Sequence, residues 1–224
     1  MTARDDTWVI IPIYNEEQVI GEVLSELLPV FPHVVCVDDG SRDKSFAVAK
    51  AAGATVIRHP VNLGQGAGLQ TGIEYVRSFT PAKYLVTFDA DGQHRVEDAL
   101  AMVEQAEKGG LAIVFGSRFL SSKTQVGWLK RLVLKTAARV TANRTGMQLT
   151  DAHNGLRVLR RDAFEQLNLL QNRMAHASEI VAQLARTGLP WAERSVLIRY
   201  TEYSKSKGQS LLNSINILTE LLVK

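Results

Sequence analysis

Short apolar runs alternate with amphipathic segments along the first half of the chain. Runs that are rich in β-branched or aromatic residues and bounded by turn residues predict strands, at residues 8–12, 34–38, 55–58, 84–88 and 112–115. Apolar positions spaced three and four residues apart predict the intervening helices, at residues 16–28, 44–52, 67–78 and 96–107. This alternation indicates an α/β fold, with a mostly parallel central sheet flanked by helices on both faces.

The second half of the chain has a looser pattern. It predicts helices, a strand and a polar loop, at residues 128–145, 176–187 and 210–223 for the helices, 192–199 for the strand and 201–209 for the loop. No repeat, low-complexity tract or linker separates these segments. We therefore expect one domain over residues 1–224, whose first half ends near residue 118 and whose second half spans residues 119–224.

Composition and charge narrow the class of protein. Hydrophobic residues make up 46% and charged residues 22%, as in ordinary globular proteins, and the formal charge of +3 gives no reason to expect nucleic-acid binding. The single cysteine, Cys36, lies in an apolar run, so we expect a buried thiol. The polar N-terminus lacks a signal-peptide pattern, and no stretch approaches about 18 consecutive apolar residues. We expect a cytoplasmic protein with at most peripheral membrane contact.

Polar motifs follow the ends of three predicted strands. Tyr14-Asn15-Glu16 follows the first strand, Asp38-Asp39-Gly40-Ser41 the second, and Asp89-Ala90-Asp91 the fourth. Ligands of parallel α/β sheets bind beyond the carboxyl ends of the strands. The three motifs are therefore expected to meet at one edge of the sheet and to form a site there.

Asp89 and Asp91 are separated by a single residue directly after an apolar strand. If the backbone there is extended, both side chains share a face, and two adjacent carboxylates repel unless a cation or a proton lies between them. A hard divalent ion such as Mg²⁺ or Mn²⁺, itself bound to a diphosphate, suits this pair, and Gln93 can add a neutral oxygen ligand. The alternative is a surface turn with solvated acids.

The first two motifs offer groups for a nucleoside. One aspartate of the pair Asp38-Asp39 is expected to point into the crevice, where a carboxylate accepts hydrogen bonds from a base N–H or a ribose hydroxyl. The structural alternative is capping of the next helix by Ser41 or Asp43. Tyr14 could stack on a base, or it could be a core tyrosine beside a capping asparagine.

A glycine-rich loop and several basic residues complete the candidates. The loop at residues 62–68 could cradle an anion on backbone N–H groups, although it lacks the spacing of a P-loop or a dinucleotide motif. Arg118 follows the fifth strand, Arg157 ends the segment that begins at Asp151, and Lys205 and Lys207 lie in the polar loop. Basic side chains near a diphosphate offset the negative charge that develops on the leaving group. For each of these basic residues, the competing interpretation is a solvated charge on the surface.

Six short motifs occur in a fixed order. They are Ile-Pro-Ile-Tyr-Asn-Glu at residues 11–16, Val-Asp-Asp-Gly-Ser at 37–41, Asn-Leu-Gly at 62–64, Phe-Asp-Ala-Asp-Gly-Gln at 88–93, Gly-Ser-Arg at 116–118 and Asn-Gly-Leu-Arg at 154–157. Together they resemble the family 2 inverting glycosyltransferases of the GT-A fold, and most of all the dolichol- and polyprenyl-phosphate mannose or glucose synthases. The resemblance covers nearly the whole chain; no single motif is specific, and the six in register are.

The resemblance implies a role for each matching residue. The nucleoside would be held by Pro12, Tyr14, Glu16, Val37 and Asp39. The diphospho-sugar would be contacted by Asp89, Ala90, Asp91 and Arg118, and the metal would be bound by Asp91 and Gln93 with Asp89. Phosphate groups, including that of the acceptor, would be met by Arg118, Arg131, Arg157, Lys205 and Lys207. The implied partners are a GDP- or UDP-hexose, a lipid phosphate, Mg²⁺ or Mn²⁺, and a second copy of the chain in a homodimer.

Departures from the family pattern limit what it implies. Gln65 stands where many relatives carry lysine, Asn154 replaces a serine or cysteine, and no Gln-X-X-Arg-Trp motif is present, which disfavours a processive polysaccharide synthase. Many relatives continue into membrane helices, so the chain is interpreted as a stand-alone enzyme or as one domain of a longer protein. The C-terminal helix could lie on a membrane or pack on its own domain.

The expected reaction is a single in-line displacement with inversion at the anomeric carbon. The metal and Arg118 would stabilise the departing nucleoside diphosphate. A lipid phosphate needs no general base, whereas a hydroxyl acceptor does, and Asp151 is the candidate base. Its structural alternative is an ion pair with Arg157. The competing functions are transfer to a saccharide or cell-envelope hydroxyl, and nucleotide-sugar binding without catalysis.

Overall fold

The computed structural model describes residues 4–120, 146–199 and 203. The predicted helices at residues 128–145 and 210–223, together with Arg131, Lys205 and Lys207, lie outside the described residues. Their predicted roles stay predictions.

Seven strands of the described chain form one mixed sheet, in the order β3-β2-β1-β4-β6-β5-β7. Their bounds are β1 Thr7–Ile13, β2 His33–Asp38, β3 Thr55–Arg58, β4 Tyr84–Thr87, β5 Ile113–Ser117, β6 Arg157–Arg160 and β7 Trp191–Ser195. β6 pairs antiparallel with β4 and β5, and the other neighbouring strands of the described sheet pair in parallel. The predicted α/β class with a mostly parallel sheet is confirmed. β6 is a strand that the sequence pattern did not predict.

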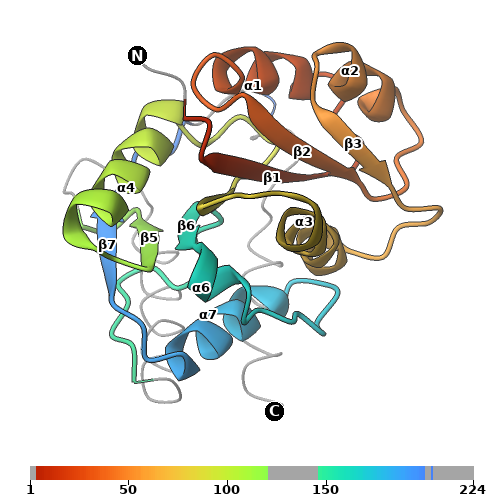
Figure 1. Ribbon diagram of the computed structural model, residues 1–224. Coiled ribbons are helices and arrows are strands. Elements are labelled where there is room, and N and C mark those ends of the chain that lie inside the picture. Colours follow the sequence, from red (N-terminus) through yellow and green to blue (C-terminus); the bar gives the residue numbers. More distant parts are fainter. Residues whose placement is uncertain (1–3, 121–145, 200–202, 204–224) are drawn as a thin grey trace.

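Helices cover both faces of this sheet (Figure 1). On one face lie α1 Ile20–Leu27, α2 Ser45–Ala51 and α4 Val96–Gly109, and on the other lie α3 Gln65–Phe79, α6 Arg161–Phe164 and α7 His176–Arg186. The helix expected from residue 16 begins at Ile20, because residues 16–19 form a turn. The N–H groups of Glu16 and Glu17 in this turn donate to the side chains of Ser45 and Asp43.

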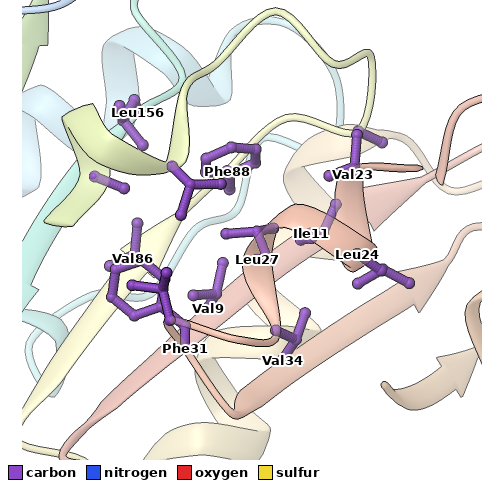
Figure 2. Packing of buried hydrophobic residues seen from close by; sticks show 14 of the residues in the cluster. Val9, Ile11, Val23, Leu24, Leu27, Phe31, Val34, Val86, Phe88 and Leu156 are labelled. Carbon is purple, nitrogen blue, oxygen red and sulfur yellow. The ribbon is translucent and has the colours of Figure 1, made fainter. Parts of the chain in front are cut away.

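Alternation along β1 feeds two cores. Val9, Ile11 and Ile13 pack toward α1 and α4, whereas Ile10 packs toward α3 on the opposite face. Figure 2 shows the first of these cores, with β1 and β4 side chains packed beneath α1. Burial on both faces explains why the central strands consist of near-continuous apolar runs. Cys36 is buried in this core as a free thiol, as predicted.

The strand directions bring distant segments to one edge of the sheet. The carboxyl ends of β1, β2, β4 and β5 share this edge because β4 and β5 both run antiparallel to β6. For the same reason the amino end of β6 lies there, with Arg157 level with Thr87 and Phe115. The predicted meeting of the strand-end motifs thus follows from the topology. Among the described residues, no helix is long and apolar enough to cross a membrane.

Candidate active site

Hydrogen bonds join the loop after β1 to the loop after β2. The N–H of Asn15 donates to Ser41 Oγ at 3.0 Å, and the N–H of Arg42 donates to Asn15 Oδ1 at 2.9 Å. Asn15 has a φ of 55°, a left-handed conformation that asparagine tolerates. The N-cap position of α2 is Lys44, which makes no side-chain cap hydrogen bond, so neither Ser41 nor Asp43 is the N-cap residue; the first N–H of α2 nevertheless donates to Asp43 Oδ1 at 2.9 Å. This part of the site is held in one geometry by its own side chains.

Asp39 is the most highly connected of the residues predicted to hold a nucleoside. Its carboxylate is buried and accepts hydrogen bonds from His59 Nδ1 at 2.8 Å, from the N–H of Leu63 at 2.9 Å and from the N–H of Gly64 at 2.7 Å. Asp39 therefore ties the loop after β3 to the end of β2. Both of its oxygens already have protein partners, and a contact with a nucleoside stays a prediction.

The other predicted nucleoside residues differ in what they expose. Tyr14 is exposed beyond the end of β1, so the alternative of a core tyrosine is wrong. Val37 and Ala90 are buried in the two cores, which leaves them no side-chain surface to offer a ligand. Glu16 meets a residue from the far end of the chain: the Tyr203 hydroxyl donates to its carboxylate at 2.6 Å. Burial and this carboxylate raise the pKa of Tyr203.

The glycine-rich loop does not form the anticipated anion cradle. The N–H groups of Gly66 and Ala67 donate to the carbonyl oxygen of Asn172, at 2.8 and 3.4 Å. A Cβ atom at Gly64 would collide with the same carbonyl oxygen, and one at Gly66 would collide with that of Gln171. The glycines are therefore explained by close packing of the segment before α7 against the start of α3, a nonlocal contact that the local sequence does not reveal.

Asp89 is held by side chains from two segments and is bordered by the backbone of a third. His94 Nε2 contacts its Oδ2 at 2.9 Å, and Gln65 Nε2 donates to its Oδ1 at 3.2 Å. A Cβ atom at Gly155 would collide with the carboxylate, so the glycine makes room for it. Burial opposes ionisation of Asp89, but the hydrogen bond and charge of His94, with the charge of Arg157, hold its pKa below the usual value. Asp89 is thus an oriented, ionised carboxylate.

Asp91 lies beside this fixed charge. β4 ends at Thr87 and a turn begins at Ala90, so the extended backbone assumed for the aspartate pair is not found. The two carboxylates nevertheless interact: burial, the charge of Asp89 and that of Glu16 raise the pKa of Asp91 to about 6. One Asp91 oxygen accepts the N–H of Gln93 at 3.0 Å. A divalent cation would relieve this repulsion, and the carboxylate and amide oxygens suit Mg²⁺ or Mn²⁺.

Such a cation would need further ligands from its substrate. In the described part of the chain no three His, Cys, Asp or Glu side chains gather as a metal site by themselves. A cation carried in by a diphosphate brings phosphate oxygens and water as its remaining ligands, which is how Mg²⁺ is commonly bound. The donor set therefore fits a metal–diphosphate complex better than a permanently bound ion.

Arg118 and Asp151 form a two-pronged ion pair. Nε and Nη2 of Arg118 donate to Oδ2 and Oδ1 of Asp151 at 2.6 and 2.8 Å. The partner of Asp151 is therefore Arg118, and the alternative pairing with Arg157 is wrong. Burial opposes ionisation of Asp151, but Arg118 holds its pKa below the usual value. A buried carboxylate with a low pKa and a bound guanidinium is a poor proton acceptor, which counts against Asp151 as a general base.

Arg157 is the largest fully buried side chain of the described chain, at the amino end of β6. Its Nε has no hydrogen-bond partner among residues 4–120, 146–199 and 203. Burial lowers its pKa to about 10 against the opposing charges of Asp89 and Asp151, so the guanidinium stays protonated at neutral pH. A buried positive charge at this edge would attract an anionic group of a ligand through its electric field rather than through direct contact.

Three histidines of the site were missed by sequence reasoning. His94 follows Gln93 directly, and this adjacency to the aspartate motif was the one available signal. His153 and His176 border Arg157; burial lowers the pKa of both, to about 4 for His153, so both imidazoles are neutral at pH 7. His176 reaches the site only through the packing of α7, which no local pattern reveals.

Comparisons with known proteins show which sequences and folds this chain resembles. An uncharacterized protein of Methanocaldococcus jannaschii, MJ1222, is 33% identical over 99% of this chain and 93% of its own length. The UDP-N-acetylglucosamine–dolichyl-phosphate N-acetylglucosaminyltransferase of Methanococcus voltae is 27% identical over 96% of this chain and 94% of its own length. The crystal structure of Mycobacterium tuberculosis glucosyl-3-phosphoglycerate synthase with Mn²⁺, UDP-glucose and phosphoglyceric acid has a TM-score of 0.67, at 18% identity, over 97% of this chain and 78% of that one.

These findings define the class of protein: an α/β glycosyltransferase with the GT-A fold, as predicted. Residues 8–167 match the family described as glycosyl transferase family 2. The chain therefore belongs to glycosyl transferase family 2, and its relatives include sugar transferases that act on polyprenyl phosphates. The predicted family and enzyme class are confirmed.

Proposed function

We propose that this enzyme is a metal-dependent inverting glycosyltransferase that moves a hexose from a nucleotide diphosphate sugar to a polyprenyl phosphate of the dolichyl type. The observation that carries the proposal is the pair Asp89 and Asp91, one carboxylate fixed by His94 and Gln65 and the other left with a pKa near 6 beside it. Charge of this kind at the ligand-binding edge of an α/β sheet is typical of a site that binds a cation with its substrate.

On the donor side, each residue has a separate task. Asp91 and Gln93, with Asp89, would hold the metal, which supplies Lewis-acid stabilisation of the departing diphosphate when it is bound. The fixed carboxylate of Asp89 can also accept a hydrogen bond from a sugar hydroxyl. Arg118 adds positive charge at the same edge, held in place by Asp151. The proposed donor is a GDP- or UDP-linked hexose.

On the acceptor side, the charges favour a phosphate over a hydroxyl. A phosphate monoester is already anionic and attacks without a general base, and buried Arg157 offers a positive charge for it. A hydroxyl would need a base, and Asp151, the candidate, is occupied by Arg118. The relative from Methanococcus voltae is named for transfer to a dolichyl phosphate. Peripheral action at the cytoplasmic face of a membrane, and a homodimer, stay predictions.

A matched pair of acceptors tests the proposal. The full chain is incubated with radiolabelled UDP- and GDP-hexoses and a detergent-dispersed short-chain polyprenyl phosphate, or the corresponding polyprenol, with Mn²⁺ or with EDTA. We expect label in the phosphate product only, with Mn²⁺ only. Transfer to the polyprenol or to a saccharide that is lost in Asp151→Asn would favour the hydroxyl-acceptor alternative. Donor binding without turnover for any acceptor would favour the non-catalytic alternative.

A further inference from the structure

Large apolar side chains are exposed on two segments beside the site. On the loop after β3, Val61 is 58% and Leu63 is 41% exposed; before α7, Leu170 is 71% and Met174 is 50% exposed. A lone exposed apolar residue needs no explanation, but several on one surface mark an interaction site. These four residues are called the apolar rim below.

Direct backbone contacts join the two segments that carry the apolar rim. The N–H of Gly66 donates to the carbonyl oxygen of Asn172 at 2.8 Å, between Leu63 on one side and Leu170 and Met174 on the other. Glu179 of α7 holds the segment before α7 in place, because its carboxylate accepts the N–H of Leu170 at 3.0 Å. The same carboxylate accepts the N–H of Gln171 at 2.8 Å.

The charge around the apolar rim is one-sided. Residues 59–73 and 166–178 contain no aspartate or glutamate. Exposed Arg173 lies between the rim residues Leu170 and Met174 in the sequence. Glu179, the next acid along the chain, is engaged by the backbone amides of the rim itself. The carboxylate of Asp39, which accepts the N–H of Leu63, is buried. Exposed apolar side chains beside an exposed arginine, with the neighbouring acids bound by backbone N–H groups, are complementary to a bilayer interface that carries anionic headgroups.

The apolar rim also borders the candidate active site. Gln65, two residues after Leu63, donates to Asp89, and His176, two residues after Met174, packs where a side chain on Gly66 would stand. We propose that the apolar rim docks on an anionic lipid bilayer and presents the open edge of the sheet to it, so that a lipid phosphate can enter while its chain stays in the membrane. The choice of a lipid bilayer as the partner of the apolar rim rests on the proposed function.

Vesicle binding tests this directly. The full chain is co-sedimented with phosphatidylcholine vesicles that contain phosphatidylglycerol, and compared with a variant in which all four rim residues are replaced, Val61→Ser, Leu63→Ser, Leu170→Ser and Met174→Ser. We expect about tenfold weaker partitioning, because the buried apolar area is lost. The matched control is Phe79→Ser, which removes a 76% exposed side chain at the opposite end of α3 and should bind like the wild type.

The outcomes separate this inference from the proposed function. Unchanged vesicle binding in the rim variant, equal loss in the Phe79→Ser control, or no binding by the wild-type chain would each overturn the inference. Thermal unfolding of the rim variant should match that of the wild type, which excludes misfolding. If rim-dependent vesicle binding is found while no lipid phosphate is glycosylated, the proposed acceptor is wrong and the docking surface stands.

Discussion

Two aspartate–histidine pairs stand at the carboxyl ends of β2 and β4. In the first, Asp39 contacts His59 at 2.8 Å, and the other ring nitrogen of His59 contacts Thr71 Oγ1 at 2.9 Å. In the second, Asp89 contacts His94 at 2.9 Å, but His94 Nδ1 is buried without a hydrogen-bond partner in the described chain. Asp39 has no carboxylate neighbour among its contacts, whereas Asp89 faces Asp91, whose pKa it raises.

The difference teaches how a scaffold and a reactive centre can use the same pair of residues. The Asp39–His59 pair is fully hydrogen-bonded, and Asp39 also binds the loop after β3, so these hydrogen bonds stabilise the fold. The Asp89 pair keeps an orphaned nitrogen and a charge that a second carboxylate opposes. A carboxylate pair whose repulsion the protein does not compensate is typical of a site where a ligand supplies the missing positive charge. Four changes test this contrast.

The largest effect is expected from Asp91→Asn. The amide oxygen can still accept the N–H of Gln93, but the carboxylate ligand is lost, so transfer should fall by about 10³-fold or more and no longer respond to Mn²⁺. Because burial and Asp89 disfavour ionised Asp91 in the folded state, the melting temperature should not fall. Transfer assays and thermal unfolding measure both; exposed Asp5→Asn is the control. An active, metal-responsive variant would sink the metal-site assignment.

Replacing His94 should weaken the site without removing a ligand. His94→Phe preserves the ring beside Phe88 but deletes the contact with Asp89 Oδ2, so we expect about 10–100-fold lower transfer. His94→Gln, which keeps a donor, should recover part of the loss, and Mn²⁺ titration of the donor complex should follow the same order. Equal activity in the wild type and both variants would show that the orientation of Asp89 does not depend on His94.

Changes to the Asp39–His59 pair should lower the stability of the fold rather than the rate of transfer. Asp39→Asn replaces an acceptor of three hydrogen bonds with an amide that can keep only part of them, so it should cost about 1–3 kcal/mol of unfolding free energy. Asp89→Asn should cost less, because the side chain of Asp89 is 31% exposed against 4% for Asp39 and accepts two hydrogen bonds rather than three. Urea denaturation of the two variants compares them. A larger stability loss from Asp89→Asn would reverse the contrast.

Local patterns were sufficient to predict the positions of Asp39 and Asp89 but not of their partners. A strand followed by a polar motif is read over a few residues, and the parallel topology then brings such ends together. His94 is local to Asp89, whereas Gln65 approaches from α3 and Gly155 from the segment before β6. Those approaches depend on how the whole sheet is assembled.

β6 illustrates the limit most clearly. It inserts antiparallel between β4 and β5, although more than 35 residues separate it from β5 in the sequence. Its position places Arg157 and Asp151 at the site and decides that Asp151 meets Arg118. A four-residue strand carries too little periodicity to be recognised alone. The glycines at residues 64 and 66 were misread for the same reason, because the segment that they accommodate lies about 100 residues away.

The smallest predicted effect concerns pH. With a pKa of about 6, Asp91 is protonated as the pH falls through that value, so metal-dependent kcat/KM at low fixed Mn²⁺ should decline below about pH 6. Glu16 contributes to this raised pKa; Glu16→Gln removes one negative charge, makes ionisation of Asp91 easier and should move the acid limb to lower pH. The amide oxygen can still accept the Tyr203 hydroxyl. Exposed Glu17→Gln is the control. If the acid limb stays in place in Glu16→Gln, or moves equally in Glu17→Gln, the titrating group is not Asp91. The carboxylates around Asp89 would then be no more strongly coupled by their charges than the Asp39–His59 pair is.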